Sequence, residues 1–397
     1  MFRSRRFFGL VLAITCVTVT PALAQVTSAP QQTVTDILDF LVTNRGVQTG
    51  DFERDRAAAE AARDTITRSL LVNLTSVPLA SSSSGFLYRM NPQLGTMERT
   101  TESFGSFFVE RALTTGAGQA SFGVSASTAA FSRLGDLELR DGSLITVANQ
   151  FSDEDEPFDT EALTLRVRSS SVTAFASVGI TDRFEIGAAL PLVQLRVDGE
   201  RLNVYRGTES LQASGEASAS GIGDIALRAK VNLFAGSNGA FAAAAEVRLP
   251  TGDEDNLLGA GATAYRFLAI GSFESGRLTL HGNGGVVFGG ISDEIQGSGA
   301  VAFAAQPRLT LSGELLVRRV AEFGTIELSA NPHPTIVGVE TFRLTATESA
   351  TTLANIVAGA KWNVSGTFVL GGHVIIPLVR NGLTAPITPT LALEYSW

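Results

Sequence analysis

The side chains best able to do chemistry in this sequence are its three histidines, His281, His333 and His373. His281 and His373 fall on predicted strands with their side chains on the polar face, so they could meet inside a barrel, whereas His333 lies in the longest loop. A zinc site needs more converging ligands than these two. No HExxH, GxSxG, Walker or Rossmann pattern holds in the sequence. We therefore predict polar lining residues, no catalytic residue, no bound metal and no cofactor.

Two acidic runs and one cysteine complete the reactive groups. The runs 153–156 and 253–255 could bind divalent cations through carboxylate oxygens, but such runs usually stay in water, which favours solvated outer loops. Cys16 is the only cysteine and lies near the N-terminus, so cleavage of that end would leave no thiol chemistry. The formal net charge of -9 argues against nucleic acid as a partner, because phosphate needs a basic surface.

Many other charges alternate with apolar residues at the two-residue period of a β-strand. Arg228 and Lys230 alternate with Leu227, Ala229 and Val231, for example. In a transmembrane barrel the apolar face meets lipid and the polar face lines the lumen. The polar-face residues that we predict to line the lumen or contact a solute are Asp224, Arg228, Lys230, Glu246, Arg248, Arg266, His281, Glu314, Arg318, Lys361 and His373, with Arg166, Arg168 and Glu394 added by the same phase. Ion pairs among these side chains would seal the lumen, whereas hydration of the lumen would let it conduct. The sequence is compatible with both alternatives.

Loop lengths favour a barrel over a soluble sandwich, which would also alternate. Short turns at 181–183, 236–239, 274–276, 306–308 and 365–366 alternate with long connections at 203–220, 251–261, 290–297, 321–350 and 381–386. Outer-membrane barrels alternate tight periplasmic turns with longer outer loops. We predict an all-β, transmembrane antiparallel β-barrel of 12 strands over residues 118–397, with 139–151 as an outer-loop extension. If residues 86–110 also cross twice, the count is 14.

The N-terminus has the three parts of a signal peptide over residues 1–24. Arginines at positions 3, 5 and 6 precede an apolar core over 7–19 and the small residues of 22–24. Lipidation at Cys16 is the alternative. No later stretch has the roughly 18 uninterrupted apolar residues of a membrane helix. The chain is therefore predicted to be exported to the bacterial outer membrane.

Residues 25–84 are predicted to form a short N-terminal periplasmic helical segment and linker. Ile37, Leu38, Leu41 and Val42 recur at helical spacing. The following stretch, 85–117, is irregular and rich in aromatic residues, which need burial. We predict that it folds into the lumen as a plug, with Phe86, Tyr88, Phe104, Phe107 and Phe108 as its aromatic residues. Such a plug beside basic side chains would suit an aromatic or amphipathic solute.

The C-terminal strand and a set of aromatic residues support the same fold. The alternation of Leu391, Leu393, Tyr395 and Trp397 resembles the strand that bacterial outer-membrane barrels present to their assembly machinery, so Leu393, Tyr395 and Trp397 are the predicted assembly signal. Aromatic residues near the short turns fit an interfacial girdle: Phe184, Phe234, Phe241, Phe273, Trp362, Phe368 and Trp397.

Three short motifs carry a family resemblance. They are Gly221-Ile222-Gly223-Asp224-Ile225 followed by Lys230, Arg248-Leu249-Pro250-Thr251-Gly252-Asp253, and Ile180 to Gly187 running on to Leu190-Pro191. Together they resemble the outer-membrane proteins named for the meta-pathway of phenol degradation, over roughly residues 117–397. That resemblance implies a barrel for uptake of hydrophobic or aromatic compounds. It does not account for the helical segment over 31–75.

These observations predict an outer-membrane barrel channel or transporter for small hydrophobic or aromatic solutes. The expected partners are outer-membrane lipid, the barrel-assembly machinery and a small-molecule solute. Two alternatives remain, a non-transporting structural barrel and an outer-membrane hydrolase. His281 is predicted to point inward, which counts against a phospholipase acting at the lipid face, although a slip of one residue would reverse this.

Overall fold

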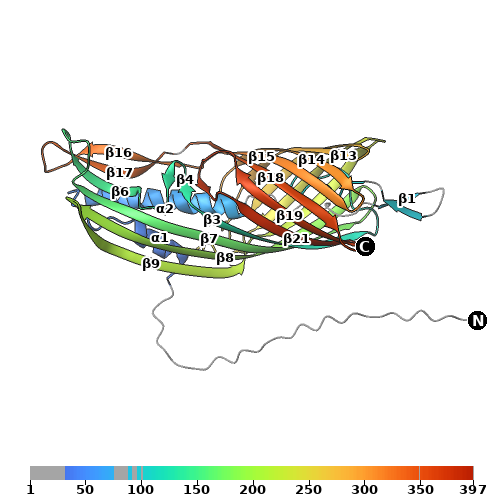
Figure 1. Ribbon diagram of the computed structural model, residues 1–397, viewed down its shortest axis with the longest axis horizontal. Coiled ribbons are helices and arrows are strands. Elements are labelled where there is room, and N and C mark those ends of the chain that lie inside the picture. The colour runs from blue at the N-terminus through green and yellow to red at the C-terminus, as the bar shows by residue number, and fades with distance from the viewer. Residues whose placement is uncertain (1–31, 76–87, 92–95, 100–101, 348, 397) are drawn as a thin grey trace, which may run out of the picture. The chain divides into compact units, whose positions relative to one another are not determined.

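A computed structural model describes residues 32–75, 88–91, 96–99, 102–347 and 349–396. Helices α1 (Val34–Val42) and α2 (Phe52–Thr75) precede a chain of strands (Figure 1). The predicted signal peptide 1–24, Phe86 and Trp397 lie outside the described residues. None of the helices in the described ranges is long and apolar enough to cross a bilayer.

Twelve antiparallel strands form a closed ring. In chain order they are β3 (Ala120–Phe131), β7 (Asp159–Gly179), β8 (Phe184–Tyr205), β10 (Ile225–Ala235), β11 (Gly239–Leu249), β12 (Ala264–Ser275), β13 (Leu278–Gly289), β14 (Glu294–Gln306), β15 (Leu309–Val320), β18 (Thr351–Asn363), β19 (Phe368–Pro377) and β21 (Thr388–Ser396). The order around the ring is β7-β3-β21-β19-β18-β15-β14-β13-β12-β11-β10-β8, and β8 pairs back with β7. The predicted 12-stranded barrel is confirmed.

The alternative of fourteen strands is wrong. Strands β1 (Tyr88–Asn91) and β2 (Thr96–Arg99) pair with each other in a separate two-stranded sheet. Between Glu102 and Gly118 the described chain has bends and turns but no strand. A further small sheet joins β4 (Arg133–Leu134), β5 (Leu137–Glu138) and β20 (Leu383–Thr384) in the connections of the barrel.

The predicted alternation sorts side chains between lumen and lipid. On β10, Lys230 and Asn232 are buried, whereas Leu227 and Leu233 are exposed. Six of the seven predicted girdle residues are likewise exposed, and these are Phe184, Phe234, Phe241, Phe273, Trp362 and Phe368. A closed antiparallel barrel with an exposed apolar belt fits only a lipid environment, since such a large apolar surface is not left in water. The barrel therefore spans the bacterial outer membrane.

Strands β7 and β8 reverse their amphipathic character partway along. The outward positions of β8 are apolar from Phe184 to Leu192 and polar from Gln194 to Glu200. Leu192 pairs with Val172 on β7, and Gln194 pairs with Ser170, so both strands change at the same height. The stretch from Phe184 to Leu192 matches the roughly 9–11 residues that a tilted transmembrane strand needs. The outer edge of the lipid belt therefore lies between these two cross-strand pairs.

This reversal corrects the prediction that Arg166 and Arg168 line the lumen. Both lie beyond the edge of the belt with their side chains exposed, and Arg166 pairs with Asp198 at 3.1 Å on the outer surface. The inward positions there are apolar instead, as Leu165 and Val167 show. The two-residue alternation continues along the strand, but the environments on its two faces exchange once the strand leaves the membrane.

Beyond the belt, further strands widen the barrel wall into an extension sheet. Strands β6 (Leu144–Phe151), β17 (Val339–Thr347) and β16 (Thr325–Pro332) continue from β7, and β9 (Thr208–Ile222) pairs with β8. The extension sheet therefore has the order β16-β17-β6-β7-β8-β9. The stretch 139–151, predicted as an outer-loop extension, contributes β6.

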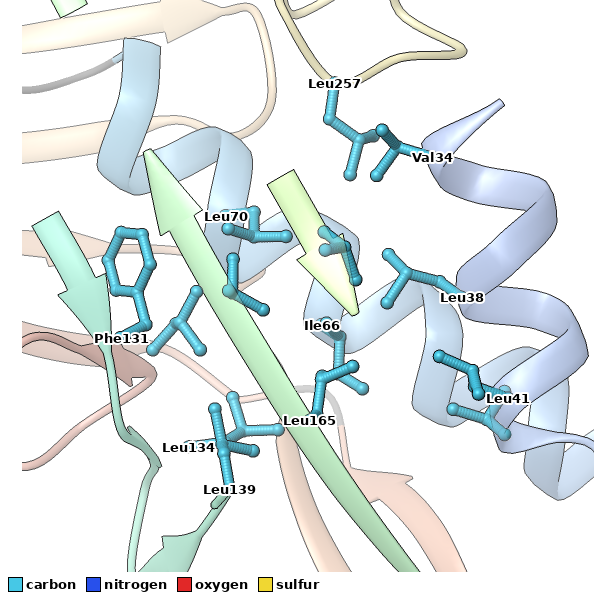
Figure 2. Packing of buried hydrophobic residues seen from close by; sticks show 14 of the residues in the cluster. Val34, Leu38, Leu41, Ile66, Leu70, Phe131, Leu134, Leu139, Leu165 and Leu257 are labelled. Carbon is cyan, nitrogen blue, oxygen red and sulfur yellow. The ribbon is translucent and has the colours of Figure 1, made fainter. Parts of the chain in front are cut away.

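Helices α1 and α2 cover the apolar inner face of the extension sheet. Val34, Leu38 and Leu41 of α1 and Ile66 and Leu70 of α2 belong to one buried cluster, and Figure 2 shows them gathered with Leu165 of β7. Close approach of α1 to β8 depends on Gly199, where a Cβ atom would stand 2.8 Å from Leu41. The sheet thus gains the cover that its apolar face requires.

The position of the helices conflicts with one of two expectations. Helix α1 contacts β8 and β9, and α2 contacts β16 and β17, all at the end of the barrel with the long connections. The C-terminal Ser396 pairs with Ser121 at the opposite end, near the short turn over 181–183. The helices and the short turns therefore lie at opposite ends of the barrel. The prediction that the helical segment is periplasmic and the prediction that the short turns are periplasmic exclude each other. The helices pack against the extension sheet because its apolar face lies beyond the lipid belt and needs another cover.

Two buried arginines, Arg201 and Arg343, fasten the helices to the strands. Arg201 of β8 binds Glu161 of β7 at 2.7 Å, with both side chains fully buried, and its guanidinium donates to the carbonyl oxygens of Phe40, Leu41 and Thr43 at the end of α1. This arginine satisfies carbonyls that a helix C-terminus leaves open and complements its dipole. On α2, Asp55 accepts from Arg343 of β17 at 2.7 Å.

Replacing Arg201 with methionine is expected to release α1. The substitution leaves Glu161 buried without its partner, which costs about 3–5 kcal/mol. Hydrogen exchange and limited proteolysis at residues 34–42 should both accelerate. The matched control is Arg196→Met on the same strand, whose exposed pair with Glu216 at 2.9 Å is worth about 0–1 kcal/mol. Equal behaviour of the two variants would contradict the fastening role.

Candidate functional site

The predicted lumen residues lie on the inner side of the ring. Of the eleven predicted lumen residues, ten are buried and Arg228 is nearly buried. The ten buried residues are Asp224 just before β10, Lys230 on β10, Glu246 and Arg248 on β11, Arg266 on β12, His281 on β13, Glu314 and Arg318 on β15, Lys361 on β18 and His373 on β19. Glu394 of β21 joins them. The barrel therefore encloses a strongly charged interior.

Residues 102–117, here called the inner segment, run among these lumen side chains. The backbone N–H groups of Phe107, Phe108 and Val109 all donate to the carboxylate of Glu314, the last two at 2.9 Å. Three converging N–H groups form a strong site for a buried carboxylate, because hydrogen bonds to a charged acceptor are the strong ones. Glu314 is therefore the central attachment of the inner segment to the barrel wall.

Lys361 forms a second attachment beside it. Its ammonium group donates to the Ser106 carbonyl at 2.9 Å, stands 4.9 Å from the ring centroid of Phe107 and pairs with Glu394 at 3.4 Å. The lysine thus combines a hydrogen bond, a cation–π contact and an ion pair. Glu394 compensates its buried charge, as a buried ion requires.

The remaining inner segment is held by strands from the other side of the ring. Glu110 pairs with Arg228, while Lys230 donates to the Arg111 carbonyl at 3.3 Å. Thr115 donates to Glu185 of β8 through both its N–H and its hydroxyl, at 2.7 and 2.6 Å. Because β8, β10, β15 and β18 all contribute, the inner segment is tied around the ring rather than to one wall.

The predicted plug aromatics behave differently from one another. Phe104, Phe107 and Phe108 are buried within the lumen, Tyr88 begins β1, and Phe86 lies outside the described residues. Phe107 presses against the barrel wall at Gly359, where a Cβ atom would stand 2.6 Å from its ring. A larger residue at that position of β18 would therefore displace the ring.

Ion pairs lie in the part of the lumen beside the inner segment. Glu246 binds both Arg248 at 2.9 Å and Arg266 at 3.4 Å, and Glu294 of β14 binds Arg318 at 3.6 Å. The charged side chains on the lumen face are thus paired with one another.

A chamber of about 220 Å³ remains between the inner segment and the end of α2. Phe107, Phe108 and His373 line it on one side, and Asn73 and Leu74 on the other. Its wall is partly hydroxylic, partly aliphatic and partly charged, with Ser125, Ser127, Ser169, Ser171, Thr173, Thr388, Thr390, Val193, Leu258, Leu316, Ile375, Asp224, Arg248, Arg318 and Glu394. The chamber is amphipathic and matches the volume of a small organic molecule.

The three histidines have separate surroundings. His373 packs between Phe107 and Phe108, with ring centroids 4.2 and 5.0 Å away. His281 lies 2.9 Å from the hydroxyl of Ser272, and His333 contacts the Gln48 carbonyl at 3.1 Å in the extension. His281 and His373 therefore lie among different residues.

The Ser272–His281 pair has the spacing of a nucleophile and its base. However, Ser272 also accepts the Ala112 N–H at 2.8 Å, and both side chains are buried beneath the inner segment. Both side chains take inward positions on their strands, away from the lipid-facing side. The geometry therefore disfavours hydrolysis of membrane lipid.

Asp224 and the acidic runs have structural contacts. Asp224 accepts from the backbone N–H groups of Gly252 at 3.1 Å and Ala260 at 2.7 Å, so it fixes the loop after β11. The run 153–156 is exposed, in agreement with a solvated loop. Asp255, in the run 253–255, accepts through its carbonyl from Thr35 at the start of α1.

Sequence reasoning missed three functional acids, Glu110, Glu185 and Glu294. Glu185 lies within the motif that begins at Ile180, and the alternation of β8 places it on the polar face, so the same rule would have found it. Glu294 opens β14 in the same way. Glu110 lies in an irregular stretch, where no period indicates direction.

The C-terminal pattern is present in part of the last strand. Leu393 is exposed toward lipid, and the Tyr395 ring packs 4.8 Å from Phe368. Trp397 lies outside the described residues. Recognition of Leu393, Tyr395 and Trp397 by the assembly machinery stays a prediction.

Comparison with known proteins agrees with the family suggested by the motifs. Residues 140–301 match the family described as "Putative MetA-pathway of phenol degradation", and all three motifs fall inside this range. The resemblance is thereby confirmed for that part of the chain. No curated protein matches the chain in sequence.

Solved structures with a similar chain course include a channel and two autotransporter domains of the outer-membrane type. An outer-membrane channel from Pseudomonas putida F1 is 14% identical over 72% of this chain and 98% of its own, with a TM-score of 0.47. The translocator domain of the autotransporter NalP from Neisseria meningitidis is 11% identical over 70% and 88%, with a TM-score of 0.37. The beta domain of the Bordetella autotransporter BrkA is 9% identical over 70% and 100%, with a TM-score of 0.35.

Proposed function

We propose that this outer-membrane barrel is a gated channel for small hydrophobic or aromatic solutes, with the inner segment as its plug. The observation that carries the proposal is the chamber of about 220 Å³ enclosed between Phe107 and Phe108 on one side and Leu74 on the other. A purely structural barrel has no need to keep an amphipathic chamber in its lumen.

The lining of the chamber supports the solute class. Phe107 and Phe108 offer ring faces, Leu316 and Ile375 offer aliphatic surface, and the serine and threonine hydroxyls opposite can bond a polar substituent. An apolar cavity of roughly 150 Å³ is enough to hold benzene. A single-ring molecule therefore fits, whereas hydrated ions find paired charges.

Gating follows from how the plug is held. Its attachments are single side chains, chiefly Glu314, Lys361 and Glu185, each contacting the backbone of the inner segment. Such contacts can be broken without unfolding the barrel, because the ring has its own complete hydrogen-bond ladder. Partial withdrawal of the plug would then connect the chamber with the short-turn end.

Deleting residues 85–115 is expected to raise single-channel conductance in planar bilayers, because it empties the lumen. Wild-type protein should show small or rare openings under the same voltage. Barrel formation is checked separately by heat-dependent gel migration. Unchanged conductance of a folded deletion protein would defeat the channel proposal and favour a non-transporting structural barrel.

A further inference from the structure

Two arginines stand opposite each other on the outward face of the barrel wall. Arg168 of β7 and Arg196 of β8 are direct cross-strand neighbours, and both side chains are exposed on the outward face. Residues in such positions have Cβ atoms roughly 4.5–5.5 Å apart, and like charges placed there repel each other. Two guanidinium groups held this close favour an anion that both can contact.

This pair lies at the height of the lipid headgroups. The last apolar outward residues are Val172 on β7 and Leu192 on β8, and the arginines follow two outward positions later on each strand. With a rise of about 3.3 Å per residue and a strand tilt of roughly 40°, the arginines stand about 7–8 Å beyond the edge of the lipid belt. The headgroup layer is about 5–8 Å thick on each side of a bilayer. The guanidinium groups are therefore within reach of headgroup phosphates.

A row of hydroxyl and amide groups separates the arginines from the apolar belt. Successive cross-strand pairs align Thr128 of β3, Ser170 of β7, Gln194 of β8 and Ser220 of β9. The hydroxyls of Thr128 and Ser170 lie 3.2 Å apart. A molecule lying along this wall meets apolar surface, then hydrogen-bonding groups, then positive charge. This is the order of acyl chains, linkage region and phosphate in an anionic lipid.

The acidic residues of this wall lie further from the membrane than the two arginines. The next outward row carries Asp198 and Glu216, and Glu200 follows in the row beyond it. Asp198 binds Arg166 at 3.1 Å, and Glu216 binds Arg196 at 2.9 Å. The row that is nearest to the headgroups therefore carries positive charge only.

The two arginines differ in how they are held. Arg168 forms no ion pair with any residue in the described part of the chain. Arg196 has its pair with Glu216, but both partners are largely exposed, and such a surface pair contributes little to stability. Arg196 can therefore turn toward a phosphate at small cost, while Arg168 is already available.

We propose that Arg168 and Arg196 bind the phosphate of a membrane lipid whose acyl chains lie against the apolar outward residues of β3, β7 and β8. Guanidinium groups bind phosphate oxygens through paired, charge-assisted hydrogen bonds. Because outer-membrane barrels carry their long loops outside, the lipid is the phosphorylated glycolipid of the outer leaflet, lipid A. The site is on the outward face of the barrel, so it depends neither on the plug nor on transport.

The test titrates the full chain, purified in a neutral detergent, with defined lipids and counts the bound molecules by native mass spectrometry. We expect one lipid A molecule to bind about 5- to 10-fold more tightly than phosphatidylglycerol. The reason is charge, because a phosphate monoester carries close to two negative charges at pH 7 whereas a diester carries one. Phosphatidylcholine, which has no net charge, should bind more weakly than either lipid.

Two variants remove the arginines separately. Arg168→Gln and Arg196→Gln should each weaken lipid A binding about 10-fold, as loss of a hydrogen bond to a charged group allows. The matched control is Arg319→Gln, an exposed outward arginine at the same end of the barrel on β15, whose cross-strand neighbours are Ile295 and Thr352 rather than a second arginine. This control should leave lipid A binding within about twofold. Folding of each variant is checked by heat-dependent gel migration.

Removal of the competing acid gives the opposite expectation. Glu216→Gln releases Arg196 and should tighten lipid A binding about twofold. Equal lipid A binding by wild type and by the double variant Arg168→Gln/Arg196→Gln would overturn the site. Phosphatidylglycerol that binds as tightly as lipid A, and that loses affinity in the same variants, would overturn the assignment to the glycolipid of the outer leaflet.

Discussion

Replacing Glu314 with leucine is expected to convert a closed barrel into a conducting one. The substitution removes the acceptor of three backbone N–H groups, those of Phe107, Phe108 and Val109, and leaves them buried without a partner. Leaving a buried backbone donor without a partner costs about 1–3 kcal/mol, and three such donors lose their acceptor here. A loss of about 4 kcal/mol shifts the docking equilibrium of the plug by roughly a thousandfold. Single-channel recording in planar bilayers should show frequent, long openings.

The matched control is Glu294→Leu. Glu294 is equally buried in the same lumen, but it pairs with Arg318 on the neighbouring strand rather than with the inner segment. Its loss should lower barrel stability without releasing the plug, so openings should stay rare. If Glu314→Leu conducts no more than wild type while its barrel is folded, the inner segment is held by something other than this carboxylate.

The barrel and its lumen face could be predicted because strand alternation is a local property. Lys230 and Leu227 take opposite faces of β10 because backbone geometry alternates them, whatever the strand pairs with. The same rule also failed locally. Arg166 follows the alternation correctly, yet its face meets water, since β7 continues beyond the lipid belt. The sequence period gives the side of the sheet, and only the fold gives the environment on that side.

The attachments of the plug could not be predicted. Glu314 and Phe107 are 207 residues apart in the chain, and the inner segment has no period from which its direction could be derived. His373 was a lumen candidate, but its pairing with Thr390 depends on the register of β19 and β21, which alternation leaves undetermined. The docking of α1 on β8 and β9 is likewise a tertiary event, invisible in the helical period of Leu38 and Leu41.

A cysteine at position 52 is expected to react with an impermeant maleimide on intact cells. Phe52 begins α2 and is 81% exposed, at the barrel end with the long connections. Phe52→Cys and Thr347→Cys should label fully from outside. Ser365→Cys, in the short turn between β18 and β19, should label only after the envelope is broken. The natural Cys16 lies in the predicted signal peptide and should give no background.

Labelling of Ser365→Cys alone would invert the barrel, and a split between Phe52 and Thr347 would mean something different. Asp55, one turn after Phe52, binds Arg343 of β17 at 2.7 Å, and β17 ends at Thr347. While that ion pair is intact, both positions must lie on the same side of the membrane. Reaction at Thr347→Cys without reaction at Phe52→Cys would therefore show that the helices leave the extension sheet in cells and remain periplasmic, as the sequence alone had suggested.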